Sequence, residues 1–108
     1  MVIDSFFSYF IVGGYMKITF ADFFSMSKPG ILIDIRDTDS FHNGHVPGAL
    51  NIRSSDLLYH TSNYLNHEDT YYLYCDVGYI SDDLCRRLRL RGYHVISIVG
   101  GYQNYLLR

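Results

Sequence analysis

The stretch YYLYCDVGYISDDLC, from Tyr71 to Cys85, contains a junction between a strand and a helix. Residues 71–75 form a short apolar run rich in aromatic side chains, which is typical of a buried strand. Residues 81–91 place leucines and a cysteine on one helical face and arginines mostly on the other. The order of strand, glycine-containing turn and helix predicts one unit of an α/β domain.

The same alternation of apolar runs and amphipathic stretches continues along the chain. We expect strands at 17–20, 31–35, 49–52, 71–75 and 95–99. We expect helices at 21–26, from 37 or 38 to 42, from 54 or 55 to 65, at 81–91 and after Gly100-Gly101. This pattern predicts an α/β domain with a central, mostly parallel five-stranded sheet and helices on both faces. In such folds ligands bind beyond the carboxyl ends of the strands, and Cys75 lies at one of these ends.

Length and composition indicate one domain with a substantial core. The chain has 108 residues, 48% of them hydrophobic, which argues against disorder. Its formal net charge is −2. Proteins that bind nucleic acid in general are normally basic, so we expect no nucleic-acid partner.

The first 15 residues are interpreted as an apolar extension ahead of a domain at 16–108. Asp4 interrupts the apolar run, and the positive start of a signal peptide is missing. The run is far shorter than the ~20 residues that cross a bilayer, so we expect no membrane association. Residues 3–11 could form an extra helix or strand on the domain or a subunit contact. Alternatively, Met16 could be the natural start.

The two cysteines are expected to be free. A chain with two cysteines and no Cys-x-x-Cys motif is typical of a reducing compartment, which favours a cytoplasmic location. A disulfide between Cys75 and Cys85 is disfavoured, because a strand end and a helix turn rarely meet its geometry. Cys85 lies mid-helix on the apolar face, so we interpret it as a core residue.

Cys75 has the position of a reactive cysteine. Backbone N–H groups converge between a strand end and a helix start, and the helix dipole adds positive potential there, so both favour a thiolate. A thiolate is a nucleophile near neutral pH. Gly78 permits the positive φ that lets the turn wrap the sulfur. The alternative is that Cys75 is a small buried hydrophobic residue.

The neighbours of Cys75 narrow its chemistry. A phosphatase-type loop needs an arginine six residues after the cysteine, and Ser81 stands there. Thioredoxin-like redox chemistry needs a second nearby cysteine, and a cysteine hydrolase needs a paired histidine, for which no local signature exists. The remaining arrangement is a lone thiolate among N–H groups, which suits a persulfide.

Four segments in order resemble the rhodanese-like single-domain sulfurtransferase family: ILIDIRD (31–37), FHNGHVPGALNI (41–52), YLYCDVGYIS (72–81) and VISIVGGYQNYL (95–106). The resemblance covers about residues 17–108. It implies a small rhodanese-like domain, with a parallel sheet flanked by helices. Members carry sulfane sulfur on one cysteine, from a donor such as thiosulfate to a thiophilic acceptor such as cyanide, a thiol or a protein.

The resemblance also assigns roles to residues. It makes Cys75 the persulfide-bearing residue. Its cradle loop would be Asp76, Val77, Gly78, Tyr79 and Ile80, with Ser81 at the start of the helix. Asp34 and Arg36 match an Asp-x-Arg pattern and are interpreted as an ion pair that supports nearby loops. His45 matches the loop before the third strand and is interpreted as structural.

We expect no cofactor and no metal. His42 and His45 are the only nearby pair of histidines, and they lack the further ligands that a metal site needs. The expected partners are a small sulfur donor, thiosulfate or a persulfide, and a thiol acceptor, which could be a protein.

Two features depart from the family pattern. Ile80 stands where many thiosulfate-using members carry a cation, and Asp76 follows the cysteine directly. Asp82 and Asp83 stabilise the helix start by ~0.3–1 kcal/mol each, but oppose a thiolate through like charge. As exposed carboxylates they would be screened within ~8 Å. We therefore predict weak thiosulfate affinity and a preference for a persulfide or protein thiol donor.

Two other functions stay open. One is a non-catalytic binding module that uses an aromatic surface, with Tyr71, Tyr79 and Tyr102 as candidates. The other is a redox sensor or reductase, because an accessible thiolate at Cys75 is easily oxidised.

Overall fold

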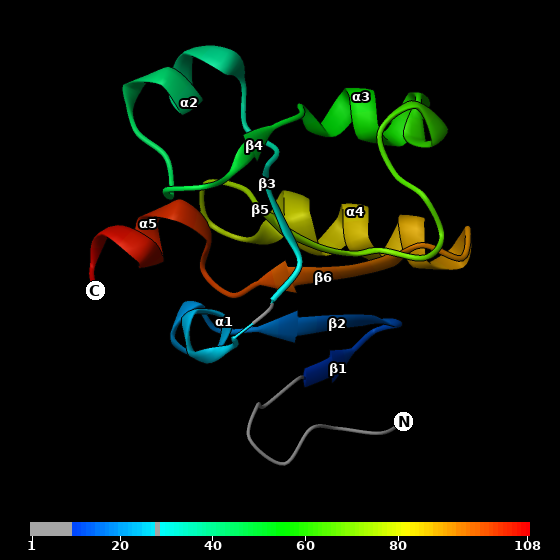
Figure 1. The fold of residues 1–108 in the computed structure, drawn as a ribbon, viewed down its shortest axis with the longest axis horizontal. Helices are drawn as coiled ribbons and strands as arrows, with labels where there is room; N and C mark the ends of the chain where they lie inside the picture. Colours follow the sequence, from blue (N-terminus) through cyan, green and yellow to red (C-terminus); the bar gives the residue numbers. More distant parts are fainter. Residues whose placement is uncertain (1–9, 28) are drawn as a thin grey trace.

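The computed structural model describes residues 10–27 and 29–108, and these form one twisted sheet with helices packed on it (Figure 1). The sheet has six strands in the order β1-β2-β6-β5-β3-β4. The strands are β1 (Phe10–Val12), β2 (Tyr15–Ile18), β3 (Ile31–Asp34), β4 (Leu50–Asn51), β5 (Thr70–Tyr74) and β6 (His94–Ile98). The helices are α1 (Phe20–Ser25), α2 (Thr38–Asn43), α3 (Ser54–Tyr59), α4 (Tyr79–Leu90) and α5 (Gly101–Leu106), with a 3₁₀ turn, η1, at Thr61–Asn63.

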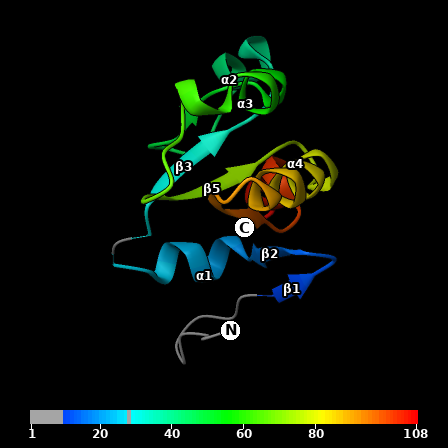
Figure 2. The same cartoon turned by 90° about the vertical axis from the view of Figure 1, so that its right-hand side faces the viewer.

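Five of the strands are parallel, which confirms the predicted fold class. β2, β6, β5, β3 and β4 pair in parallel, with Ile33 opposite Leu73 and Leu73 opposite Ser97 at the centre of the sheet. Figure 2 shows how strongly the sheet twists between β2 and β3. This order places the carboxyl ends of β3 and β5 next to each other, and residues 34–36 therefore lie beside Cys75.

The sheet has a sixth strand, β1, beyond the five predicted for the central sheet. β1 pairs with β2 in antiparallel fashion, and Gly13 and Gly14 form the two-residue turn between them. Their φ angles of 56° and 84° are those of the hairpin turns that two-residue loops favour. The expectation for residues 3–11 lies mostly outside the described residues, and only Phe10 and Ile11 fall within β1. The boundary between an N-terminal extension at residues 1–15 and a domain at 16–108 stays a prediction.

The sheet is covered on both faces, as predicted. On one face, α3 and α4 supply Leu57, Leu84 and Leu88 to a core with Leu73 and Val95. The other face is covered by α1, with the aromatic rings of α5 packed against it. Alternate residues of each central strand enter alternate cores, because side chains along a strand point to opposite faces.

The first predicted strand begins two residues too late. The sequence suggested a strand at 17–20, but the chain leaves the sheet after Ile18 and α1 begins at Phe20. The Thr19 hydroxyl accepts a hydrogen bond from the Asp22 N–H at 3.0 Å, which caps the helix. This side-chain cap ends the strand where apolar character alone would continue it.

The helix predicted from 54 or 55 to 65 is also interrupted. α3 ends at Tyr59, His60 leaves helical geometry, and η1 follows. The buried Thr61 hydroxyl donates to the Leu57 carbonyl oxygen. Such a bond from a short polar side chain competes with helical geometry and explains the early end.

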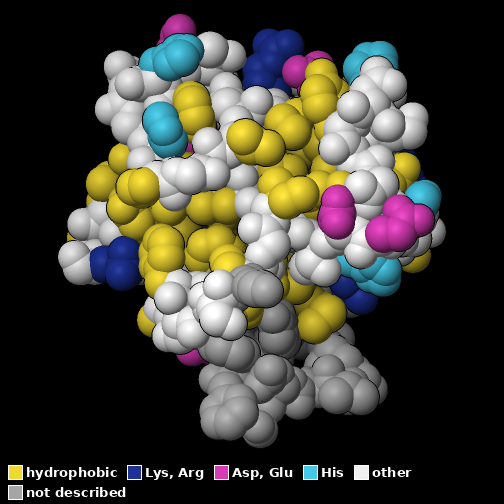
Figure 3. All heavy atoms as spheres, in the orientation of Figure 1, with side chains coloured by type: hydrophobic (Ala, Val, Ile, Leu, Met, Phe, Trp, Pro, Cys, Tyr) yellow, Lys and Arg dark blue, Asp and Glu magenta, His cyan; other side chains and the backbone are white. Residues whose placement is uncertain are grey.

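The surface drawn in Figure 3 is apolar at its centre. Hydrophobic side chains gather there, while Lys and Arg occur as separate groups toward the edges. Within the described part of the chain, none of the helices has the length and apolar character needed to span a bilayer.

Candidate active site

Cys75 lies directly after β5, and its sulfur faces the first turn of α4. The Gly78 N–H donates to the Cys75 Sγ at 3.1 Å, and the Ser81 N–H donates to it at 3.4 Å. Gly78 caps the helix with a φ of 111°, a conformation that favours glycine. The expected approach of N–H groups and a helix N-terminus to this sulfur is therefore present.

The helix begins earlier than the sequence suggested. α4 starts at Tyr79, so Ser81 lies inside its first turn rather than at its start. The reason is that Gly78 turns the chain tightly enough for the residues after it to be helical at once. This places both the N–H and the hydroxyl of Ser81 near the sulfur.

A pocket of about 310 Å³ opens over Cys75. Its lining combines the loop after β5 with the ends of β3 and the starts of α2 and α3. The lining residues are Ile35, Arg36, Asp37, Ser40, Ser54, Cys75, Asp76 and Ile80. A pocket of this size suits a small sulfur compound or the tip of a protein side chain.

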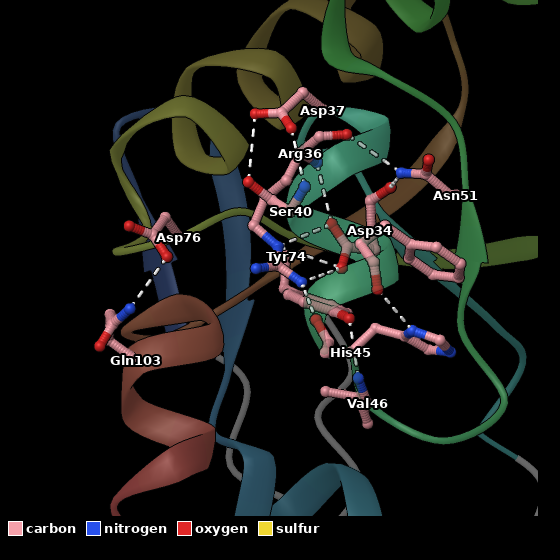
Figure 4. Close-up of polar contacts among 12 residues, drawn as sticks. Asp34, Arg36, Asp37, Ser40, His45, Val46, Asn51, Tyr74, Asp76 and Gln103 are labelled. Atoms are coloured by element: carbon pink, nitrogen blue, oxygen red, sulfur yellow. Dashed lines mark hydrogen bonds and ion pairs between the residues drawn. The ribbon is translucent and has the colours of Figure 1, made fainter.

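The loop of residues 76–80 contacts the Cys75 sulfur through its backbone, by the Gly78 N–H. The side chains of Val77, Tyr79 and Ile80 are turned toward solvent, with Tyr79 80% exposed. Asp76 accepts a hydrogen bond from the Gln103 amide at 3.1 Å, which ties the loop to α5 (Figure 4). Of the loop side chains, those of Asp76 and Ile80 also line the pocket.

Among the described residues, Arg36 is the Lys or Arg side chain that lines the pocket over Cys75. It forms the expected ion pair with Asp34, with Nη2 and Oδ2 2.7 Å apart, and donates to the Gly44 carbonyl oxygen (Figure 4). Its guanidinium also lies 4.2 Å from the centroid of the Tyr102 ring. The loop of residues 76–80 contains no Lys or Arg. The cation in the pocket lining is Arg36, which follows β3.

His45 contacts its own loop. Its Nδ1 lies 2.8 Å from the Phe41 carbonyl oxygen, and its ring stacks on that of Phe41 at 3.7 Å. The described residues contain no group of three or more His, Cys, Asp or Glu side chains placed to hold a metal ion.

The two cysteines are free, as expected, and lie in different surroundings. Cys85 is fully buried in the core under α4. Burial raises the pKa of the Cys85 thiol far above its usual range, so this thiol stays protonated. Cys75 instead faces a pocket.

The structure corrects two expectations about charged and aromatic residues. Asp82 is not an exposed carboxylate, because it pairs with Lys17 at 2.9 Å and accepts a hydrogen bond from Ser97. Tyr71 is buried and offers no binding surface. The contacts of Asp82 follow from β6 and β2 lying beside α4, which sequence periodicity does not show. Tyr71 is buried because it lies in β5, between β3 and β6.

Sequence reasoning missed three residues near the site. Ser97 is fully buried in β6 and bonds to Ser81, and Lys17 reaches Asp82 from β2. Gly101 packs against the backbone of the Cys75 loop. The only sequence signal for Ser97 was a polar residue within the apolar run VISIV.

Comparison with known proteins bears on this arrangement. The model of the rhodanese-like domain matches residues 22–107. The chain belongs to the rhodanese-like domain family. The match includes the Cys75 loop, both strands that border the pocket and α5, so the resemblance drawn from the four sequence segments is confirmed.

Individual rhodanese-like proteins agree with this assignment. A rhodanese-related protein from Thermoplasma volcanium shares the fold, with a TM-score of 0.76 at 23% identity over 84% of this chain and 90% of that one. A human single-domain sulfurtransferase gives a TM-score of 0.63 at 26% identity, over 73% of this chain and 82% of that one.

A tRNA sulfurtransferase of Desulfurococcus amylolyticus is 35% identical over 81 residues. These residues are 73% of this chain, which spans only 16% of the length of that relative. Together the matches support sulfur transfer as the general class of chemistry, without specifying a donor or an acceptor.

Proposed function

We propose that this rhodanese-like domain is a sulfurtransferase or sulfur carrier that holds sulfane sulfur as a persulfide on Cys75. The observation that carries the proposal is the pair of backbone N–H groups, from Gly78 and Ser81, that point at the Cys75 sulfur on the floor of a pocket. Donors of this kind stabilise negative charge on sulfur without a cofactor.

The proposed reaction has two displacement steps. In the first, the Cys75 thiolate attacks the outer sulfur of a donor, the Sγ–S bond forms, and the donor's S–S bond breaks. The donor's remaining part leaves with the bonding electron pair, as sulfite from thiosulfate or as a thiolate from a persulfide. In the second, an acceptor thiolate attacks the outer sulfur, and the Cys75 thiolate leaves with the electron pair. Neither step consumes an external oxidant or reductant.

The preferred donor is a persulfide, small or on a protein, rather than thiosulfate. The Arg36 guanidinium is paired with Asp34, so it offers little net charge to a dianion. The carboxylates of Asp37 and Asp76 also line the pocket, and their negative charge repels a dianion such as thiosulfate. A weak affinity for thiosulfate is therefore part of the proposal, as is a cytoplasmic location suited to two free thiols.

The test is sulfur loading measured by intact mass. The protein is incubated with thiosulfate or with a small-molecule persulfide, and the mass is compared for the wild type, Cys75→Ser and Cys85→Ala. We expect the wild type and Cys85→Ala to gain one sulfur atom that cyanide removes, and Cys75→Ser to gain none. If the folded wild type gained sulfur from neither thiosulfate nor the persulfide, the proposal would be refuted.

A second candidate function is a protein-binding module. The exposed apolar side chains of Val77, Tyr79 and Ile80 at the pocket rim favour it. If the domain is a binding module, Cys75→Ser should bind its protein partner as tightly as the wild type does. If it is a carrier, Cys75→Ser should no longer exchange sulfur with that partner.

A further inference from the structure

A second pocket adjoins the pocket over Cys75 and lies between α3 and α4. Its volume is about 220 Å³. Ser54 and Ile80 line both pockets, so the two pockets share a wall. A molecule whose sulfur reaches Cys75 can therefore place another of its groups in the second pocket.

The lining of the second pocket suits an apolar group. Its apolar lining residues are Leu58, Tyr59, Ile80 and Leu84. The charged residues of the lining, Asp83 and Arg87, pair with each other, with Oδ2 and Nε 2.9 Å apart. An apolar side chain that enters this pocket leaves water without separating a charge from its partner.

The size of the second pocket suits one side chain. Pockets that hold a whole drug-sized ligand have volumes of about 300–1,000 Å³, and this one is smaller. Around the two pockets, the side chains of Tyr59, Val77 and Tyr79 are exposed although they are largely apolar. Exposed apolar side chains gathered around a site are typical of a surface that another protein covers. A polypeptide segment fills the two pockets and covers this rim better than a small sulfur compound does.

The pocket over Cys75 differs from the second pocket in charge. Asp37 and Asp76 line it, and neither forms an ion pair with another described residue. The remaining charged lining residue, Arg36, is paired with Asp34. The surroundings of Cys75 therefore carry excess negative charge, which favours a partner with basic residues close to its own cysteine.

We propose that the second pocket is a subsite for an apolar side chain of a polypeptide whose cysteine exchanges sulfur with Cys75. The proposal rests on the proposed function and deepens it, because it names the class of partner. That partner is a protein segment with an apolar residue near its cysteine and a basic residue beside it. Three extended residues span up to about 10 Å, so the apolar residue is expected within three positions of the cysteine.

The test measures how fast short peptides form a disulfide with Cys75. Each peptide carries one cysteine as a pyridyl disulfide. The Cys75 thiolate attacks the peptide sulfur, a new S–S bond forms, and pyridinethiolate leaves with the electron pair of the old S–S bond. Each rate is divided by the rate of the same peptide with β-mercaptoethanol, which corrects for the reactivity of the peptide itself. Peptide mass locates the modified cysteine in the protein.

The first set of peptides tests the apolar subsite. One peptide has only glycines around its cysteine, and the others carry a leucine one, two or three positions before or after it. We expect the best-placed leucine to raise the rate about tenfold, which corresponds to about 1.4 kcal/mol. The gain is limited because the pocket is open on one side, so the leucine loses only part of its exposed surface. If no leucine peptide reacts faster than the glycine peptide, the proposal is overturned.

Variants of α3 connect this gain to the second pocket. Ser55→Phe places a ring in the pocket, and Tyr59→Ser removes part of its lining, both at exposed positions. Each should reduce the advantage of the leucine peptide over the glycine peptide. Tyr64→Ser is the matched control, because Tyr64 is also exposed but does not line the pocket, and it should keep the advantage. The proposal fails if the advantage survives in both α3 variants or is lost equally in the control.

Further probes test the class of the partner. A lysine beside the cysteine should raise the rate and a glutamate should lower it, and 1 M NaCl should reduce this difference because the screening length falls to about 3 Å. Pentyl pyridyl disulfide offers an alkyl chain without a peptide, so it should react more slowly than the peptide with leucine and lysine. Equal rates for the lysine and glutamate peptides would overturn the basic partner. A pentyl compound as fast as the best peptide would assign the subsite to a small apolar thiol and overturn the proposal.

Disulfide formation needs no sulfur donor, so its outcome is distinct from that of the loading experiment. If Cys75 takes up a sulfur atom but prefers no peptide, only the present proposal is lost. If the peptides show the expected preference but Cys75 takes up no sulfur atom, the subsite stands and the persulfide function is refuted.

Discussion

Gly101 packs directly on the carbonyl oxygen of Cys75. A Cβ at Gly101 would overlap that oxygen and would lie 2.6 Å from the carbonyl oxygen of Asp76. The next two N–H groups of α5 bind the same carbonyls, from Tyr102 to Cys75 at 2.8 Å and from Gln103 to Asp76 at 3.0 Å. The first turn of α5 therefore holds the backbone of the loop that carries the thiol.

Gly101→Ala is expected to destabilise the protein by about 2–5 kcal/mol, from left-handed backbone strain at its φ of 61° plus overlap with the loop. Gly48→Ala is the matched control, because Gly48 has a φ of 86° but open space around its Cβ position. It should lose only the strain, about 1–2 kcal/mol. Urea denaturation measures both, and equal losses would show that the contact with the Cys75 loop has no energetic weight.

The Asp34–Arg36 pair is expected to be strongly coupled. Asp34 is fully buried and the Arg36 side chain is only 9% exposed, so Arg36→Gln leaves a buried carboxylate without its partner and should cost about 3–5 kcal/mol. The exposed pair of Arg87 and Asp83 is the control, and Arg87→Gln should cost less than about 1 kcal/mol. A double-mutant cycle with Asp34→Asn measures the coupling, and additive losses would contradict it.

Ile80→Arg is expected to improve thiosulfate use. Ile80 lines the pocket and is exposed enough to accept a longer side chain. A cation near a dianion at ~5 Å in a solvated pocket gains about 1 kcal/mol or more, so the KM for thiosulfate should fall about fivefold. Ile80→Gln, of similar length without charge, should leave this KM close to the wild-type value. Equal KM values for the arginine and glutamine variants would show that charge is not what limits thiosulfate binding.

The protein is expected to lose stability above pH 10. Burial and a hydrogen bond with Asp34 raise the pKa of Tyr74 above its ordinary 10.0, and the bond to Asp82 raises the pKa of Lys17 above 10.5. A folded-state pKa above the unfolded one means that the folded protein binds more protons in this range. The stabilisation is thus complete below pH 10 and declines as the pH rises toward the folded-state values.

Tyr74→Phe separates the contribution of this phenol. The variant should be less stable at pH 8 by about 1–3 kcal/mol, because the buried Val46 N–H loses its acceptor at 3.0 Å. Its stability should decline less steeply between pH 10 and 11 than that of the wild type. Parallel declines in urea denaturation at these pH values would exclude Tyr74 as a source of the pH dependence.

Much of the fold was predictable because its elements are locally encoded. Apolar runs such as ILIDI and VISIV mark the central strands. Of the two helix starts that the sequence left open, 37 and 38, the structure has Asp37 as the cap of α2, accepting from the Ser40 N–H at 2.8 Å. The errors lie where a side-chain bond overrides periodicity, as at Thr19 and Thr61. The β1–β2 hairpin was missed although Gly13-Gly14 between two apolar runs is a turn signal.

The candidate site was predictable only along its own loop. The positions of Cys75 and Gly78 between a strand and a helix indicated the approach of N–H groups to the sulfur, and Asp34 and Arg36 were recognisable two residues apart. Ser97 and Lys17 were not, because they reach Ser81 and Asp82 from strands that follow or precede α4 at a distance in the chain.

The sequence by itself determined the alternation of strands and helices, the thiol at a strand's carboxyl end and the absence of a cation between Cys75 and Ser81, because these are properties of neighbouring residues. Only the tertiary structure decided what surrounds the thiol. The parallel order β2-β6-β5-β3 brings Arg36 to the pocket side of the sulfur and Ser97 to its buried side. Pairing between distant strands set this arrangement, since hydrogen bonds and charges act through space and not along the chain.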